Sequence, residues 1–242
     1  NEMLPHVSDV RTAIAPVGIL GMMGNKGGVS IRLDLYDTSI CFVASHLSSG
    51  GGRAAVEARN FDFGEICRKT RFTTDYVSAA SDSLASLDQK GWRRTGSHRS
   101  QELTIEDHHM VFWLGDLNYR ISGSISREKI VEEIEAGNLD ILLENDQLNI
   151  ERVEKKSVMW GFHEPPITFN PTYKFIPNTY LYDQRPDKKM RPPAWCDRIL
   201  WRCVEQEEGA APGAGKVASF TVKKKGQGQG LGLGEAGEFY PG

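Results

Sequence analysis

A carboxylate and an amide stand two residues apart, directly after a short apolar run. Residues 110–114 are Met-Val-Phe-Trp-Leu, and Gly115, Asp116 and Asn118 follow. In an extended backbone, residues two apart project to the same side, so Asp116 and Asn118 would share one edge of a sheet. Phosphate-ester hydrolysis needs a group that orients and deprotonates water, and donors for the developing negative charge. Asp116 suits the first role and Asn118 the second, although the same pattern is also typical of an ordinary turn.

A second polar pair stands where another strand is expected to begin. Pro192 and Pro193 fix an extended approach to Asp197 and Arg198, and residues 199–201, Ile-Leu-Trp, favour the strand that follows. The planar fork of an arginine suits phosphate. The alternative is a structural Asp–Arg pair beneath a buried tryptophan.

Four residues supply further polar or cationic groups: Tyr173, Lys174, Lys189 and Arg191. The three cations could converge on a second phosphate of a polyanionic substrate, although a lone lysine is more often solvated surface. His46 ends the apolar run of residues 40–44, where a core or capping role is as plausible as catalysis. The glycine-rich turn of residues 24–28 is, by default, structural.

Strands alternate with helices, which favours an α/β sandwich. Residues 29–35 alternate apolar with polar side chains, as expected of a half-buried strand. Residues 53–69 suit a helix with a stripe of Val56, Asn60, Phe63 and Cys67. A second helix is expected between a Ser126 cap and Gly137, with Ile130, Val131 and Ile134 on its apolar face. The polar segment 78–105 is expected to be a surface insertion.

The composition predicts one soluble domain followed by a tail. The chain has 242 residues, a net charge of −3 and four cysteines. This charge does not favour a nucleic-acid binder, and so few cysteines indicate a reducing, intracellular setting. We expect one domain over residues 1–205. Residues 206–242 are rich in glycine and lysine and predict a disordered tail, whose residues 223–225 (KKK) either are solvated or touch an anionic membrane.

Taken in order, these pieces closely resemble the signature of the type II inositol polyphosphate 5-phosphatases, in particular the group of the Lowe-syndrome phosphatase. The resemblance spans roughly residues 10–202. Two stretches make it specific: WLGDLNYR at 113–120 and PAWCDRIL at 193–200. Three shorter stretches support it: GNKGGV at 24–29, SHL at 45–47 and PTYK at 171–174.

The resemblance implies a DNase-I-like four-layer β-sandwich flanked by helices. It also implies Mg²⁺-dependent removal of the 5-phosphate from phosphatidylinositol 4,5-bisphosphate or related inositol phosphates. Asp116 would orient the water, Asn118 would contact the scissile phosphate, and His46 would lie in the active-site wall. We place Asp197 and Arg198 in the same catalytic group. The 4-phosphate would be held by four residues: Tyr173, Lys174, Lys189 and Arg191.

The same resemblance implies partners and a location. The partners would be phosphoinositide headgroups, soluble inositol polyphosphates and a peripheral membrane surface, but not nucleic acid. The protein would be cytoplasmic and peripheral at intracellular membranes. A non-catalytic phosphoinositide-binding or interaction module is the alternative. A nuclease of the same fold is disfavoured by the PTYK and PAWCDR stretches and by the slightly acidic balance.

The sequence departs from the family pattern in ways that bear on catalysis. The family has an early asparagine and a magnesium-binding glutamate before the glycine turn, and a Ser-Asp-His motif after the last strand; neither occurs here. Ala44 and Gly50 stand where the family has an asparagine and a second histidine. We therefore expect a sandwich truncated at both ends, with metal ligands outside this chain and catalysis impaired.

Overall fold

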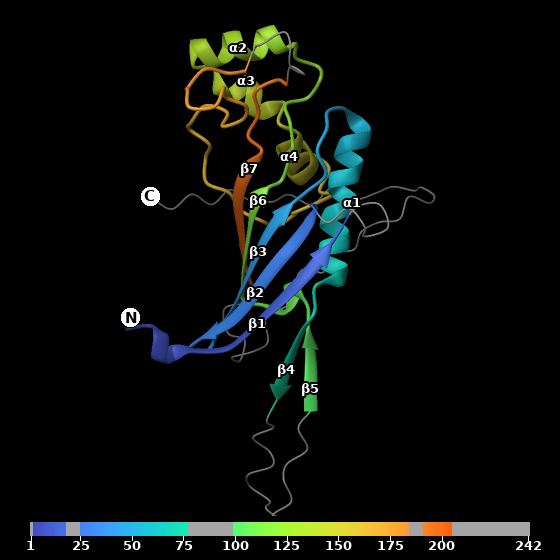
Figure 1. Ribbon diagram of the computed structural model, residues 1–242, viewed down its shortest axis with the longest axis vertical. Coiled ribbons are helices and arrows are strands. Elements are labelled where there is room, and N and C mark those ends of the chain that lie inside the picture. The colour runs from blue at the N-terminus through green and yellow to red at the C-terminus, as the bar shows by residue number, and fades with distance from the viewer. Residues whose placement is uncertain (1, 18–24, 77–98, 184–190, 205–242) are drawn as a thin grey trace, which may run out of the picture.

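The computed structural model describes residues 2–17, 25–76, 99–183 and 191–204. Lys189 and the expected tail lie outside these ranges. A five-stranded mixed sheet forms the body of the described chain (Figure 1), in the order β1-β2-β3-β6-β7. Strands β3 and β6 run parallel, and the other neighbours are antiparallel. The strand bounds are Val7–Pro16, Gly27–Leu35, Thr38–His46, Met110–Asp116 and Asp197–Cys203.

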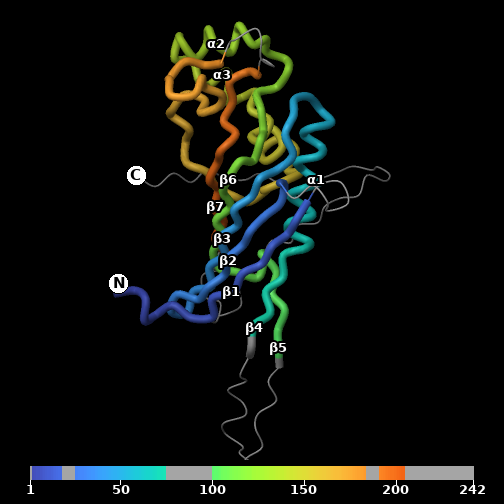
Figure 2. Tube along the Cα trace, viewed as in Figure 1, coloured from blue at the N-terminus to red at the C-terminus, as the bar shows by residue number. Residues whose placement is uncertain are grey.

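Helix α1 lies along the sheet, and the other helices gather beyond one end of it (Figures 1 and 2). The helices are α1 (Arg53–Lys69), α2 (Arg127–Ala136), α3 (Leu139–Glu144) and α4 (Gln147–Asn149). The short helical segments are η1 (Leu4–His6), η4 (Ile105–Asp107) and η5 (Ile150–Glu154). A separate two-stranded sheet pairs β4 (Phe72–Tyr76) with β5 (Arg99–Leu103).

The helix ends form as their sequences predict. Ser126 caps α2 by accepting a hydrogen bond from the backbone N–H of Lys129, and Gly137 ends that helix in the left-handed region at φ 75°. Ile130 and Ile134 are buried on the expected face. Helix α1 has the predicted bounds of residues 53 and 69.

Strand β2 buries the face opposite to the expected one. Its alternation is as predicted, but Gly28, Ser30 and Arg32 are buried, whereas Val29 and Ile31 are 52% and 42% exposed. Close packing against α1 explains why this face of β2 is the buried one. A Cβ on Gly28 would lie 2.7 Å from Cγ2 of Ile66 in α1, so only glycine allows the helix this close.

The other face of the large sheet has no cover among the described residues. Ile14, Phe42 and Ile199, on three different strands, are 74%, 38% and 60% exposed, beside Val29 and Ile31 of β2. The described residues therefore form an α/β arrangement in which helix α1 lies against one face of the large sheet. They do not include the second sheet of the four-layer sandwich that the resemblance implies.

Two segments differ from the sequence-based expectation. Strand β1 was not predicted, because a bulge between Ser8 and Arg11 interrupts its period and its most buried residue is the small Ala15. Of the segment 78–105, expected to be a surface insertion, residues 99–103 form strand β5 and most of the rest lies outside the described residues. Within the described ranges, no helix combines the length and apolarity needed to cross a bilayer.

Candidate active site

Three predicted site residues stand side by side at the end of the large sheet. His46 ends β3, Asp116 ends β6 and Asp197 begins β7; Asp116 is in register with both of the others. The Nε2 atom of His46 lies 3.2 Å from Oδ2 of Asp116. Gly115 makes this approach possible, because a Cβ there would lie 2.2 Å from the carbonyl oxygen of Ser45. The sheet therefore brings together the groups that the sequence placed at separate strand ends.

The carboxyl group of Asp197 lies near the negative charge of Asp116 at this rim. Partial burial, and then the negative charge of Asp116, raise the pKa of Asp197, while the proximity of His46 opposes the rise. A raised carboxyl pKa beside a second carboxylate is typical of sites that hold a proton or a cation.

Asn118 lies under the rim in a left-handed conformation, at φ 57°. Its backbone N–H donates to Oδ1 of Asp116 at 3.1 Å, and its side-chain Nδ2 donates to the carbonyl of Leu47 at 3.1 Å. The contact with Leu47 uses one of the two hydrogens of the side-chain amide. Contact of the other hydrogen with a scissile phosphate stays a prediction.

Lys26 is a rim residue that the sequence analysis missed. Its ammonium group lies in hydrogen-bonding contact with Nε2 of His46. Burial lowers the pKa of Lys26, and the carboxylates of Asp116 and Asp62 oppose that effect. The signal was present, since Lys26 stands inside the glycine-rich turn that was interpreted as structural.

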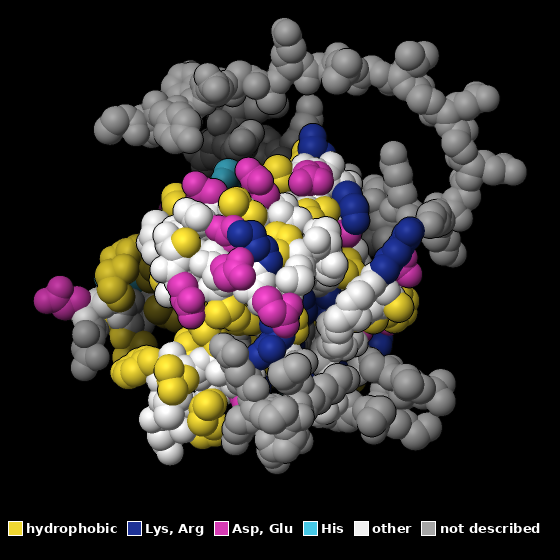
Figure 3. Space-filling view, turned by 90° about the horizontal axis from the view of Figure 1, so that it is seen from above, with side chains coloured by type: hydrophobic (Ala, Val, Ile, Leu, Met, Phe, Trp, Pro, Cys, Tyr) yellow, Lys and Arg dark blue, Asp and Glu magenta, His cyan; other side chains and the backbone are white. Residues whose placement is uncertain are grey.

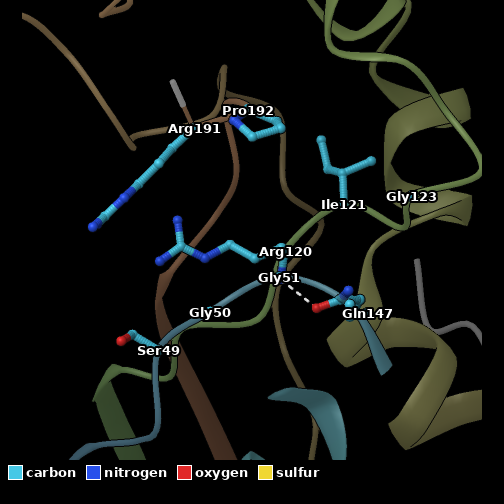
Figure 4. Close-up of a pocket in the computed structure, with 10 residues that line it drawn as sticks. Ser49, Gly50, Gly51, Arg120, Ile121, Gly123, Gln147, Arg191 and Pro192 are labelled. Carbon is cyan, nitrogen blue, oxygen red and sulfur yellow. Dashed lines mark hydrogen bonds between the residues drawn. The ribbon is translucent and has the colours of Figure 1, made fainter. Parts of the chain in front are cut away.

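Beside the rim lies a cavity of about 320 Å³ with two guanidinium groups (Figure 4). Arg120 and Arg191 both extend toward the same side of it, and residues 49–52 form another part of its wall. Tyr173 joins the two arginines: the guanidinium of Arg120 lies 4.2 Å from its ring centroid, and Arg191 donates to its hydroxyl at 2.5 Å. Arg120 was not predicted as a site residue.

The expected 4-phosphate residues are only partly brought together. Tyr173 and Arg191 are in contact. The Nζ atom of Lys174 lies 3.8 Å from a carboxylate oxygen of the buried Asp183, and Lys174 is not among the residues that line the cavity. Lys189 lies outside the described residues.

Arg198 does not lie at the rim, and its assignment to phosphate contact is corrected. Strand alternation turns it to the face opposite Asp197, where its side chain is 1% exposed. It donates to Oδ1 of Asp146 at 2.8 Å and, through two nitrogens, to Glu164 at 2.6 Å. Burial alone would lower the pKa of Arg198, but these carboxylates outweigh burial and raise it. Arg198 therefore has a structural role, but its partners are Asp146 and Glu164 and not Asp197, so the Asp–Arg pair offered as the alternative is also corrected.

The helical end of the molecule and the cavity differ in the sign of their surface charge. Seen from above, Asp and Glu side chains gather over α2 and α3 (Figure 3). The exposed acidic residues of these helices are Glu128, Glu132, Glu135, Asp140 and Glu144. A polyanion would be repelled there and attracted to the arginines of the cavity.

The described residues do not form a complete metal site. Within them, no group of three or more His, Cys, Asp or Glu side chains could hold an ion. Asp116 and Asp197 provide two carboxylates at neighbouring strand ends, whereas a hard cation such as Mg²⁺ takes about six oxygen ligands.

Comparisons with known proteins converge on one family. Residues 1–211 match the model of endonuclease/exonuclease/phosphatase family 2. The type I inositol polyphosphate 5-phosphatase 5 of Arabidopsis thaliana is 39% identical over 83% of this chain and 35% of its own length. The type II inositol 1,4,5-trisphosphate 5-phosphatase of Mus musculus is 38% identical over 83% of this chain and 18% of its own length. The chain thus spans about a third or less of these relatives.

One solved structure shows the same likeness. The inositol polyphosphate 5-phosphatase domain of SPsynaptojanin, in complex with inositol (1,4)-bisphosphate and calcium ion, matches with a TM-score of 0.64 and 36% identity. The match covers 84% of this chain and 49% of that one. This likeness confirms the DNase-I-like α/β fold class. The chain therefore belongs to endonuclease/exonuclease/phosphatase family 2, and these relatives and this solved structure, which it resembles, are inositol polyphosphate 5-phosphatases.

Proposed function

We propose that the protein is a Mg²⁺-dependent phosphatase that removes the 5-phosphate of phosphatidylinositol 4,5-bisphosphate or a related inositol polyphosphate. The observation that carries this proposal is the contact of His46 with Asp116 beside a cavity with two arginines. Asp116 orients and deprotonates the attacking water, while Nε2 of His46 lies beside its carboxylate and the positive charge of Lys26 attracts that carboxylate. Asn118 donates to the scissile phosphate. Mg²⁺ would neutralise charge on the phosphoryl oxygens, with ligands completed outside the described residues.

The non-reacting phosphate would occupy the cationic side of the site. Tyr173, Lys174, Lys189 and Arg191 hold the 4-phosphate in this proposal, and Arg120 joins them because its guanidinium faces the same cavity as that of Arg191. The substrate is either a membrane headgroup or a free inositol phosphate. The protein would act in the cytoplasm, at the surface of intracellular membranes.

Replacing Lys174 with Ala tests the assignment of the second phosphate. A hydrogen bond to a charged group is worth about 1.5–3 kcal/mol, so affinity for inositol 1,4,5-trisphosphate should fall at least about tenfold. Affinity for an inositol 5-monophosphate, which has no 4-phosphate, should change less than about twofold. Isothermal titration calorimetry measures both. Lys156→Ala is the matched control, because Lys156 is an exposed lysine that stacks over Trp160 and does not line the cavity.

Equal losses for the two ligands would remove Lys174 from the 4-phosphate subsite. The alternative, a module that binds headgroups without hydrolysis, predicts the same affinities but no phosphate release under any metal condition. The calorimetric and hydrolytic results together therefore separate the two functions.

A further inference from the structure

We infer that Arg59, inside helix α1, is a positioning residue that fixes the two loops forming the site. This inference rests on the proposed function for the role of Arg120, but its structural part can be measured separately. Arg59 is fully buried, at 0% exposure. Its Nη1 donates to the carbonyl oxygens of Ser48 at 3.3 Å and Gly50 at 3.0 Å. One guanidinium group thus holds the loop that follows His46 and forms one wall of the cavity.

The same guanidinium reaches the second loop through Gln147. Nη2 of Arg59 donates to Oε1 of Gln147 at 2.7 Å, and that oxygen also accepts the backbone N–H of Arg120 at 2.9 Å (Figure 4). The backbone N–H of Gln147 donates to the carbonyl of Arg120 at 2.9 Å. Gln147 therefore holds both backbone groups of Arg120, and Arg59 orients the oxygen that makes one of these bonds.

Neighbouring residues of α1 reinforce this attachment. Asp62 accepts the backbone N–H of Ser48 at 2.8 Å, and Asn60 accepts the hydroxyl of Tyr119 at 2.7 Å. The guanidinium of Arg59 lies 5.0 Å from the ring centroid of Tyr119. The loops after β3 and β6 are therefore attached to one turn of one rigid helix. The cavity wall and the Arg120 guanidinium keep a fixed separation only while that attachment holds.

A buried arginine could instead serve overall stability, and Arg32 provides the comparison. Arg32 is 2% exposed and contacts Asp9, Asp34 and His108. It lies five residues along β2 from Gly27, which is in register with His46, so it stands about 16 Å from the rim. Replacing either arginine removes a buried positive charge and leaves its hydrogen-bond partners unpaired, but only Arg59 contacts the site loops.

Hydrogen exchange on the full chain separates the two roles. In Arg59→Met, exchange of the Ser48 and Arg120 amides should accelerate at least about tenfold relative to the Val43 and Val111 amides of the central sheet. In Arg32→Met, the two site amides should not accelerate beyond the central ones. Affinity for inositol 1,4,5-trisphosphate should fall at least about tenfold in Arg59→Met and less than about twofold in Arg32→Met.

Two further variants keep the test decisive if Arg59→Met does not fold. Gln147→Met removes the shared oxygen and leaves Arg59 bonded to Ser48 and Gly50, so only the Arg120 amide should accelerate. Arg59→Lys retains a donor for one loop only and should restore protection at Ser48 but not at Arg120. Uniform acceleration across the sheet in Arg59→Met, or an unchanged Arg120 amide in Gln147→Met, would overturn the inference.

The binding measurement tests the proposed function separately from the role of Arg59. If the unsubstituted chain does not bind inositol trisphosphate, the proposed function fails, whereas the exchange pattern still decides whether Arg59 positions the two loops.

Discussion

Replacing Asp116 with Asn is expected to lower the rate of phosphate release from inositol 1,4,5-trisphosphate by about 10²–10⁴-fold, the usual contribution of a general base. Asparagine has nearly the same shape and can still contact His46, but it cannot take a proton from water. The measurement is single-turnover phosphate release with Mg²⁺ and enzyme in excess.

Asp140→Asn is the matched control for this experiment. Asp140 is an exposed carboxylate in α3, away from the rim, so its replacement should leave the rate unchanged. If Asp116→Asn retains a rate within about threefold of the original, Asp116 does not deprotonate the attacking water, and the assignment fails.

Replacing Arg198 with Met is expected to destabilise the protein by about 3–5 kcal/mol, because the buried Asp146 would lose its cation and Glu164 would keep only Arg152, at 3.7 Å. Urea unfolding followed by circular dichroism measures this loss as a fall in the transition midpoint. Arg53→Met provides the comparison: its side chain is 84% exposed and pairs with Glu57, so the change should stay below about 1 kcal/mol.

The Arg198 result also tests the correction made from the structure. A loss below about 1 kcal/mol, together with a large loss of affinity for inositol trisphosphate, would return Arg198 to the substrate site. Unchanged affinity in a destabilised protein is the outcome that agrees with a buried ion pair.

The location of the site could be predicted because strand ends leave a clear pattern. A short apolar run that stops at a polar group identified the ends of β3 and β6, and the pairing of these strands then placed His46 beside Asp116. The ends of α2 could be predicted equally well, since the capping residues Ser126 and Gly137 interact with backbone groups only a few residues away. Local patterns therefore predicted the local structure.

Buried polar residues were the features that the sequence did not predict. Val56 and Phe63 of the expected stripe of α1 are buried, but Asn60 and Cys67 are only half-buried. The stripe missed the buried Arg59 and Asp62, which hydrogen-bond to backbone groups of the loop after β3. Such residues resemble surface residues until their partners are known. Arg198 illustrates the same point, since both of its acidic partners come from distant segments.

The face that β2 buries could not be deduced from hydropathy either. Close packing between helix and sheet determines which face is buried. Gly28 lets α1 pack closely against that face, while Val29 and Ile31 on the other face remain exposed. Alternation of period two identifies a strand but does not say which face is covered.

The central claim is that the rim and the adjacent arginine cavity bind an inositol polyphosphate, and a titration with inositol 1,4-bisphosphate tests it most directly. Amide resonances of the labelled chain would be followed by nuclear magnetic resonance as ligand is added. The account predicts saturable shifts at Asn118, Arg120 and Tyr173, which Arg120→Ala weakens, with no shifts along α2. Shifts confined to α2 and α3, or no saturable change up to about 1 mM ligand, would contradict it.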